Sequence, residues 1–296
     1  MKSHLLHAAL VLTLAEGCGP APDPAPPPEE PHQTARPLDT DNGLTSNGLT
    51  FNGLAFNGLS INGLASNGLS SANFAAWFSQ NPLEANLFMK YLVRCAVPAG
   101  QTKAFSNGWL TYSWEGGLGL APSWSGGSPA TLEEQQAVSA CLGALTNKYG
   151  RSVLLSVVGA DARGQPIATP PEELETYSLR EGCFFGNLFN GQGLFVGTDH
   201  APLASNQSSL RACALEGANQ CPPLKYIGSC AQSCQKDSTG TYFTRCAWQG
   251  ISYHALSTRL RPEEINTCGD GVCQFPEVCG NNDRDGTCRS DCGRCK

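Results

Sequence analysis

The distribution of cysteine constrains this chain more than any other feature. Fourteen of its fifteen cysteines form one set of eight and one of six, and only Cys18 stands apart. Even sets in a chain with an export signal predict disulfides made in an oxidising compartment. A reduced zinc protein is the alternative, but exported chains rarely keep free thiolates. The connectivity cannot be deduced from spacing. The two sets are Cys95, Cys141, Cys183, Cys213, Cys221, Cys230, Cys234 and Cys246, and Cys268, Cys273, Cys279, Cys288, Cys292 and Cys295.

Residues 1–18 have the pattern of a secretory signal peptide. A basic start is followed by an apolar stretch of about ten residues, which is too short to span a membrane. The segment ends in Leu-Ala-Glu-Gly-Cys18, which resembles the lipobox of bacterial lipoproteins, whose cysteine is lipidated after cleavage. Lipidation would also explain a lone cysteine at a mature N-terminus, and plain cleavage beside Cys18 is the alternative. In that family, Gly19 after the cysteine implies the outer membrane.

Two segments of biased composition follow the signal. Residues 19–41 hold eight prolines, which favour an extended polyproline II tether. Residues 42–71 repeat Asn-Gly-Leu every five residues, six times from Asn42 to Leu69. Asn-Gly favours tight turns, yet too few residues separate the turns for hairpin strands. Three interpretations stay open: a flexible spacer, a short coil that caps the next domain, or a self-associating strip.

Residues 72–262 are long enough for a real core and predict a disulfide-rich α+β domain with an antiparallel or mixed sheet. Ser71 or Asn73 can cap a first helix, and Pro82 begins a second one. The stripe of the second helix, spaced i, i+4, is Leu83, Leu87, Tyr91 and Cys95.

Further signals along this domain are local. Thr131-x-x-Glu134 is a capping box that opens a helix, which we expect to stop at Gly150. Residues 152–158 predict a strand buried on both faces, and a short helix should begin at 170–171. From Cys183 onward, short runs between glycines and cysteines predict small strands joined by disulfides.

Several runs resemble exported proteins of myxobacteria that have no characterised activity. The last two runs also resemble the cysteine-rich repeats at the C-terminus of proteins of that group. In this chain they lie within residues 263–296. The resemblance implies a secreted or surface protein and supplies no activity. The runs are 91–100, 118–122, 138–142, 181–189, 268–273 and 288–292.

The cysteine-rich tail contains a candidate calcium loop. Asn281, Asp283 and Asp285 place oxygen ligands at alternate positions before a glycine, a spacing used by calcium loops. The glutamate expected at the twelfth position is absent, so Asp291 or Glu277 would have to replace it. The alternative is that these residues only form turns between cysteines.

The net charge and the absence of catalytic motifs argue against several functions. The net charge is −6 and no lysine or arginine cluster is present, which argues against nucleic acid as a partner. His200 and His254 are the only histidines of the globular part, and either could serve a secreted hydrolase. No nucleophile elbow, metalloprotease or phosphate-loop motif accompanies them, so the sequence leans away from an enzyme.

Trp109, Trp114 and Trp124 lie in a glycine-rich segment and could form a platform for a ligand or fill the core.

Together the features of the whole sequence predict a surface-anchored lipoprotein that acts as a binding or structural module, in adhesion or in the envelope. Its partners would be the membrane, through the N-terminal lipid, and an extracellular polysaccharide or protein. A secreted hydrolase that uses His200 or His254 is the alternative.

Overall fold

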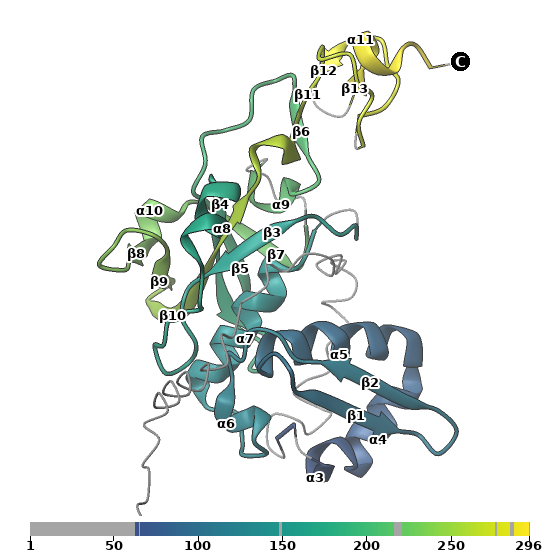
Figure 1. Ribbon diagram of the computed structural model, residues 1–296, viewed down its shortest axis with the longest axis vertical. Helices are drawn as coiled ribbons and strands as arrows, with labels where there is room; N and C mark the ends of the chain where they lie inside the picture. Colours follow the sequence, from purple (N-terminus) through teal and green to yellow (C-terminus); the bar gives the residue numbers. More distant parts are fainter. Residues whose placement is uncertain are drawn as a thin grey trace, which may run out of the picture. The chain divides into compact units, whose positions relative to one another are not determined.

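The sheet at the centre of the fold is mixed and seven-stranded, as expected for the α+β class (Figure 1). The computed structural model describes residues 63–64, 66–147, 150–215, 221–275, 277–284 and 287–295. The predictions for the signal peptide, Cys18, the tether and the first four repeat units lie outside these residues. The strands run in the order β7-β5-β4-β10-β9-β8, with β3 also paired to β10. Their bounds are β3 Leu155–Val158, β4 Leu179–Asn187, β5 Gly193–Thr198, β7 Leu224–Ser229, β8 Cys234–Lys236, β9 Phe243–Trp248 and β10 Ile251–Leu260.

Strand β10 organises this sheet because it changes partners along its length. Residues 251–254 pair with β9, whereas 255–260 pair with β4 and 257–260 also pair with β3. All pairs are antiparallel except β5 with β7. Three smaller two-stranded ladders complete the strands. They are β1 Thr102–Ser106 with β2 Thr111–Glu115, β6 Gln207–Ser209 with β11 Ile265–Thr267, and β12 Asp283–Arg284 with β13 Thr287–Cys288.

Three helices of the described chain are longer than eight residues, and their starts follow the predicted signals. Ser71 caps α4 (Ala72–Gln80), accepting the Phe74 N–H at 3.2 Å, and Pro82 begins α5 (Pro82–Ala96). Thr131 and Glu134 form the expected capping box of α7 (Leu132–Ala144). The shorter helices are α3 Ser66–Leu69, α6 Pro122–Ser125, α8 Pro171–Thr176, α9 Ala212–Leu215, α10 Cys230–Ser233, α11 Arg289–Cys292 and the 3-10 turn η1 Pro262–Glu264.

Two helix expectations were wrong. Helix α7 ends at Ala144 and does not reach Gly150, because the Arg211 guanidinium donates to the Ala144 carbonyl at 2.7 Å and satisfies the helix end. In α5 the first half of the predicted stripe was wrong: Leu83 and Leu87 are exposed, whereas Tyr91 and Cys95 are buried as predicted. A second stripe, spaced i, i+3, i+4, i+7, also faces the core. That stripe is Ala85, Phe88, Met89 and Leu92.

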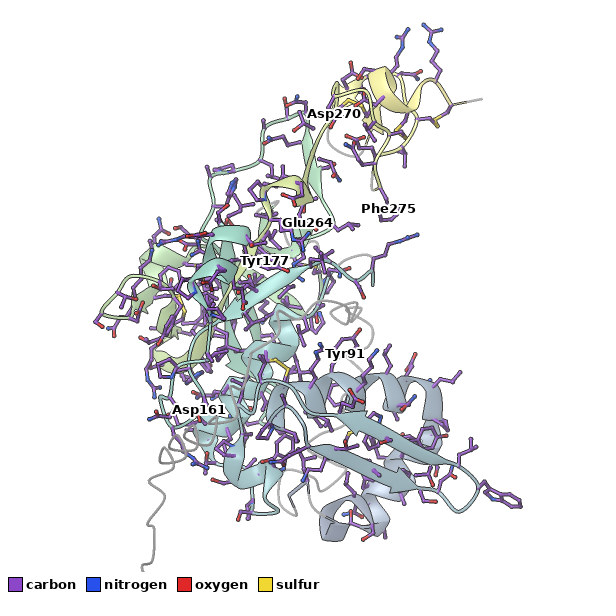
Figure 2. The ribbon with its side chains drawn as sticks, in the orientation of Figure 1. Tyr91, Asp161, Tyr177, Glu264, Asp270 and Phe275 are labelled. Carbon is purple, nitrogen blue, oxygen red and sulfur yellow. A yellow bond between two sulfur atoms is a disulfide. The ribbon has the colours of Figure 1, made fainter. Side chains whose placement is uncertain are left out.

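The central sheet has a core on each face. Helix α7 packs on β4 and β10, as Figure 1 shows. Along β4, Phe184 belongs to the core cluster beneath α7, whereas its neighbour Phe185 belongs to the second cluster. Successive strand residues point to opposite faces, so this alternation separates the two cores. Strand β3 is buried at all four positions, as predicted, but it covers only Leu155–Val158 of the expected residues 152–158. Tyr177, at the end of α8, is buried beside Arg261 (Figure 2).

Seven disulfides join the fourteen cysteines, which confirms the prediction from their even numbers. Each bond stays within its own set, four in the domain and three in the tail. Such pairing indicates a protein of an oxidising, extracellular-type compartment. The bonds are Cys95–Cys141, Cys183–Cys230, Cys213–Cys221, Cys234–Cys246, Cys268–Cys288, Cys273–Cys292 and Cys279–Cys295.

The last two repeat units belong to the folded core. Leu64 is fully buried, Leu69 is nearly so, and residues 66–69 form the helical turn α3. For this end of the repeat, the arrangement agrees with the cap interpretation.

Candidate functional site

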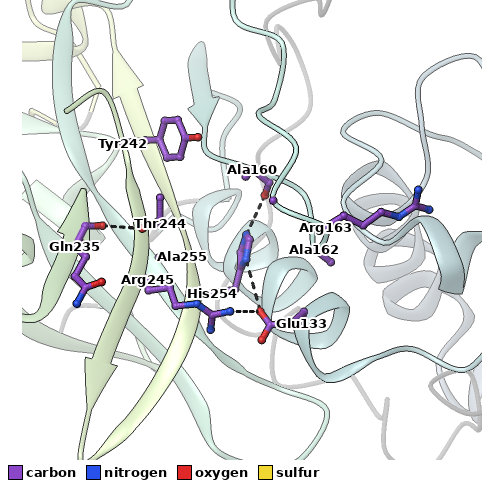
Figure 3. A pocket seen from close by; sticks show the side chains of 11 residues that line it. Glu133, Ala160, Ala162, Arg163, Gln235, Tyr242, Thr244, Arg245, His254 and Ala255 are labelled. Atoms are coloured by element: carbon purple, nitrogen blue, oxygen red, sulfur yellow. Dashed lines mark hydrogen bonds and ion pairs between the residues drawn. The ribbon is translucent and has the colours of Figure 1, made fainter. Parts of the chain in front are cut away.

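A row of polar side chains crosses strands β8, β9 and β10. The register pairs Gln235 with Arg245 and Arg245 with His254, so the three side chains share one face of the sheet. The sequence neighbours of these three residues point to the opposite face of the sheet. There Cys234, Cys246 and Tyr253 form a matching row that packs in the second core. All three polar residues line one pocket of about 550 Å³ (Figure 3).

The walls of this pocket come from a helix and a loop. Glu133 stands in the first turn of α7. The loop 160–164 follows β3 and is tightened by Asp161, whose side chain accepts the Arg163 N–H at 2.8 Å and the Gln165 N–H at 2.9 Å. Tyr242, Thr244 and Ala255 complete the lining. The pocket therefore brings together segments separated by more than a hundred residues.

His254 is the most constrained group in the pocket. Its Nε2 lies 2.9 Å from the Ala160 carbonyl oxygen, and because a carbonyl only accepts, Nε2 carries the proton. Its backbone N–H donates to Gln136 Oε1 at 2.9 Å. Burial lowers the pKa of His254, more than nearby acidic groups raise it. The imidazole is therefore neutral at pH 7, and Nδ1 is left as a hydrogen-bond acceptor.

Glu133 connects the histidine to an arginine. Its Oε2 accepts from Arg245 Nη2 at 2.9 Å and lies 4.0 Å from His254 Nδ1. Two acceptors face each other across this longer gap, so each needs a donor of its own, which two hydroxyl groups of one ligand could supply. Burial and the charge of Asp237 raise the pKa of Tyr242, so its hydroxyl stays protonated and can donate. In Figure 3 the Arg163 side chain extends away from His254.

The second histidine does not share this site. His200 is absent from the pocket lining, and its ring contacts the neighbouring Ala201 carbonyl. Asp199, its sequence neighbour, lies 3.8 Å from Arg180 and 3.9 Å from Lys236. Among the described residues that line the pocket of His254, none is a serine or a cysteine. The Thr244 hydroxyl donates to the Gln235 carbonyl at 3.2 Å and is committed to the sheet.

The three candidate tryptophans occupy different environments and form no common platform. Trp124 is fully buried, and Trp114 is buried with its indole N–H donated to Asn86 Oδ1 at 2.8 Å. Trp109 is 95% exposed, in the turn between β1 and β2. Strand β2 begins two residues after this tryptophan, at Thr111. Two of the three residues thus fill the core.

The candidate calcium residues divide into separate groups. Asp283 Oδ1 accepts the Ser290 N–H at 2.9 Å, Asn281 is exposed, and Asp285 lies outside the described residues. Asp291 accepts three backbone N–H groups, of Gly269, Asp270 and Gly271, which lower its pKa.

Among the described residues of the tail, Glu277 indicates where a cation would fit. One carboxylate oxygen accepts the Gln274 N–H at 3.1 Å, while the other is buried without a hydrogen-bond partner. Carboxylate oxygens of Glu277 and Asp291 lie within 4.8 Å of each other, beside Cys288. That cysteine is held in a disulfide and has no thiolate to offer. The residue pair suits a hard, oxygen-preferring ion such as calcium.

Comparison with known proteins gave no match to a family model, a curated protein or a solved structure. Within the described residues, no helix combines the length and the apolar character that crossing a membrane requires. The resemblance to exported myxobacterial proteins accordingly rests on the sequence runs alone.

Sequence reasoning singled out His254 but missed its neighbours. Glu133, Gln235 and Arg245 are ordinary polar residues whose proximity depends on the β8-β9-β10 register. A signal was present beside one of them: Arg245 precedes Cys246, so if the cysteine faces the core the arginine must face the other side.

Proposed function

We propose that this chain is a surface-anchored lipoprotein whose disulfide-stapled domain binds an extracellular ligand, in adhesion or in envelope organisation. The observation that carries the proposal is the pocket around His254, whose polar lining is fixed on strands held by disulfides. Anchoring is supported by the lipobox-like segment that ends at Cys18 and by the resemblance to exported proteins.

The lining favours a saccharide as the ligand. Arg245, Glu133 and Gln235 are planar groups that donate or accept hydrogen bonds in pairs, which matches vicinal hydroxyls. His254 Nδ1 adds an acceptor, and the Tyr242 ring adds an apolar surface with a polar tip. Opposite charges on Arg245 and Glu133 compensate each other at 2.9 Å, and the third charged side chain of the lining, Arg163, extends away from His254 (Figure 3). The part of the pocket around His254 therefore favours a neutral polar ligand over an ion.

Isothermal titration of the exported chain with neutral oligosaccharides tests this proposal. Chitotetraose, cellotetraose and maltotetraose are suitable probes. At least one should bind with a Kd below about 1 mM, and Gln235→Ala should weaken that binding by about tenfold, the loss of one good hydrogen-bonding group. Gln232→Ala, outside the pocket lining, is the matched control. If no oligosaccharide binds, or if both variants bind equally well, a saccharide is not the ligand.

A hydrolase is the second candidate function, and the state of His254 favours it. A neutral, buried imidazole whose Nδ1 is free to accept a proton has the properties of a general base, with Glu133 nearby. Hydrolysis of p-nitrophenyl esters and glycosides by the chain would be measured beside a His254→Asn variant. Turnover that disappears in the variant would favour an enzyme, and turnover no higher than the buffer rate would dismiss it.

Lipid anchoring is tested by cell fractionation. The native chain should sediment with membranes and carry acyl chains detectable by mass spectrometry, whereas Cys18→Ser should be released. An unchanged membrane fraction for the variant would show that the lipid is not the anchor.

A structural calcium ion in the tail is also proposed, with Glu277 and Asp291 as ligands. Chelation should make tail peptides more susceptible to protease in the full-length chain, and added calcium should restore resistance. Glu277→Gln should remove the calcium response. If chelation leaves the cleavage rate unchanged, the tail needs no ion.

A further inference from the structure

The fifth repeat unit is inserted into the folded domain. Leu64 is fully buried, and its backbone N–H donates to the Trp124 carbonyl at 2.9 Å. Gly63 has φ +77°, and a Cβ at this position would come within 2.4 Å of the Gly127 carbonyl carbon. Real Cβ atoms do not approach backbone so closely, so only glycine fits. We call the receiving site, formed by Trp124 and Gly127 at the end of α6, the socket.

The socket is held in place by parts of the domain other than the repeat. The Trp124 ring packs edge-on against Phe189, with centroids 5.4 Å apart. The Ser123 and Trp124 N–H groups donate to Glu134 Oε1 at 2.6 and 3.3 Å, which ties α6 to the capping box of α7. The Trp124 carbonyl also accepts the Gly127 N–H at 3.1 Å, so its orientation is fixed.

What the socket recognises is present in every repeat unit. The contact uses a glycine with positive φ, a buried leucine, and the leucine N–H. Residues 42–59 contain four more copies of Asn-Gly-Leu, and the asparagine favours the turn that glycine needs. The unit at 67–69 lies in α3 instead, with Leu69 buried separately, and holds the chain on its own domain.

We propose that the socket also binds Asn-Gly-Leu units from a second copy of this chain, so that the repeat acts as a multivalent strip for self-association. When two copies exchange units, each docked Asn-Gly-Leu is replaced by one of the same sequence, so the glycine turn, the buried leucine and the leucine N–H bond are kept. Several units on each strip raise the effective concentration for a second contact after the first. The partner is thus another copy of this protein, recognised by glycine and leucine at fixed spacing.

Peptide binding to the full-length chain tests the recognition. A labelled peptide of residues 41–60 carries four units. Leu64→Ala removes the side chain that competes for the socket, so this variant should bind the peptide about tenfold more tightly than the native chain. Leu69→Ala makes a similar core cavity outside the socket and should bind like the native chain. A peptide with alanine at each repeat glycine should not bind, because a Cβ meets the Gly127 backbone.

Equal binding to both variants, or binding of the alanine peptide, would overturn the proposal. Should Leu64→Ala lose its near-ultraviolet dichroism, the native chain provides a separate measurement. Light scattering after size exclusion should find dimers or larger species that increase with concentration and disappear when residues 42–61 are deleted. A native chain that stays monomeric at every concentration would equally rule out association through the socket.

Discussion

The replacement of Arg211 by methionine would measure what a fully buried ion pair contributes to this fold. Both side chains of the pair are inaccessible to solvent, with Arg211 Nε 2.8 Å from Glu181 Oε1. The guanidinium also donates to the carbonyls of Ala144 at 2.7 Å and Thr146 at 2.9 Å. One side chain therefore joins β4, the end of α7 and the segment before α9. Methionine keeps the bulk and removes every one of these bonds.

The expected loss is large because the variant leaves a carboxylate buried without its partner. Breaking a buried pair by removing one member typically costs about 3–5 kcal/mol. For a domain of this size each kcal/mol lowers Tm by roughly 2–4 °C, so the expected decrease is about 6–20 °C. Replacing Glu181 by methionine as well removes the stranded charge, so the double variant should be more stable than Arg211→Met alone.

Arg245→Met is the control because its ion pair, of similar length, lies at the surface. Arg245 Nη2 lies 2.9 Å from Glu133 Oε2, but their side chains are 44% and 36% exposed. Such pairs contribute at most about 1 kcal/mol, so Tm should fall by less than about 4 °C. Scanning calorimetry would measure the Tm of both variants, and thiol titration would verify that their disulfides are intact. Equal decreases for the two variants would refute the claim that burial decides the contribution.

Three further outcomes follow from the same structure. Burial lowers the pKa of His254 in the folded chain, so the imidazole binds a proton more readily in the unfolded chain. The free energy of unfolding should therefore fall as pH decreases through about 6.5. In urea titrations at several pH values, a His254→Gln variant should lack this part of the pH dependence. Trp124→Ala should lower the free energy of unfolding by about 3–5 kcal/mol, whereas Trp109→Ala, at the exposed turn, should change it by less than about 0.5 kcal/mol. Gly197→Ala should lower Tm measurably, because the new Cβ would lie 3.0 Å from both sulfurs of a buried disulfide, and an unchanged Tm would show that the disulfide can shift.

Local signals predicted much of the secondary structure. The capping box at Thr131 and the proline at position 82 act through bonds within three or four residues, so no distant segment alters them. Local signals did not predict which face of α5 is buried. Two periodic stripes overlap in that helix, and the choice between them depends on which one meets the aromatic residues of α4 and the β1–β2 hairpin. Leu83 therefore stayed exposed although its spacing fitted a core residue.

The pocket depends on information that no single segment contains. Glu133 and His254 are 121 positions apart, and only the pairing of β10 with β9 and the packing of α7 on β10 brings them together. The repeat posed the opposite difficulty, because its units are alike in sequence but not in structure. Gly63 has a positive φ and Leu64 is docked beside it, whereas residues 66–69 form a helical turn. The domain surface beneath each unit makes the difference.

The disulfides and the pocket are connected through the same three strands. Cys234 pairs with Cys246 across β8 and β9, and their bond fixes the register of the two strands. Because side chains alternate between faces, a slip of one residue would turn Arg245 from the pocket toward the second core. The cysteine row on one face thus determines which residues meet on the other. The disulfide that resists unfolding therefore also holds the side chains of the candidate site in place.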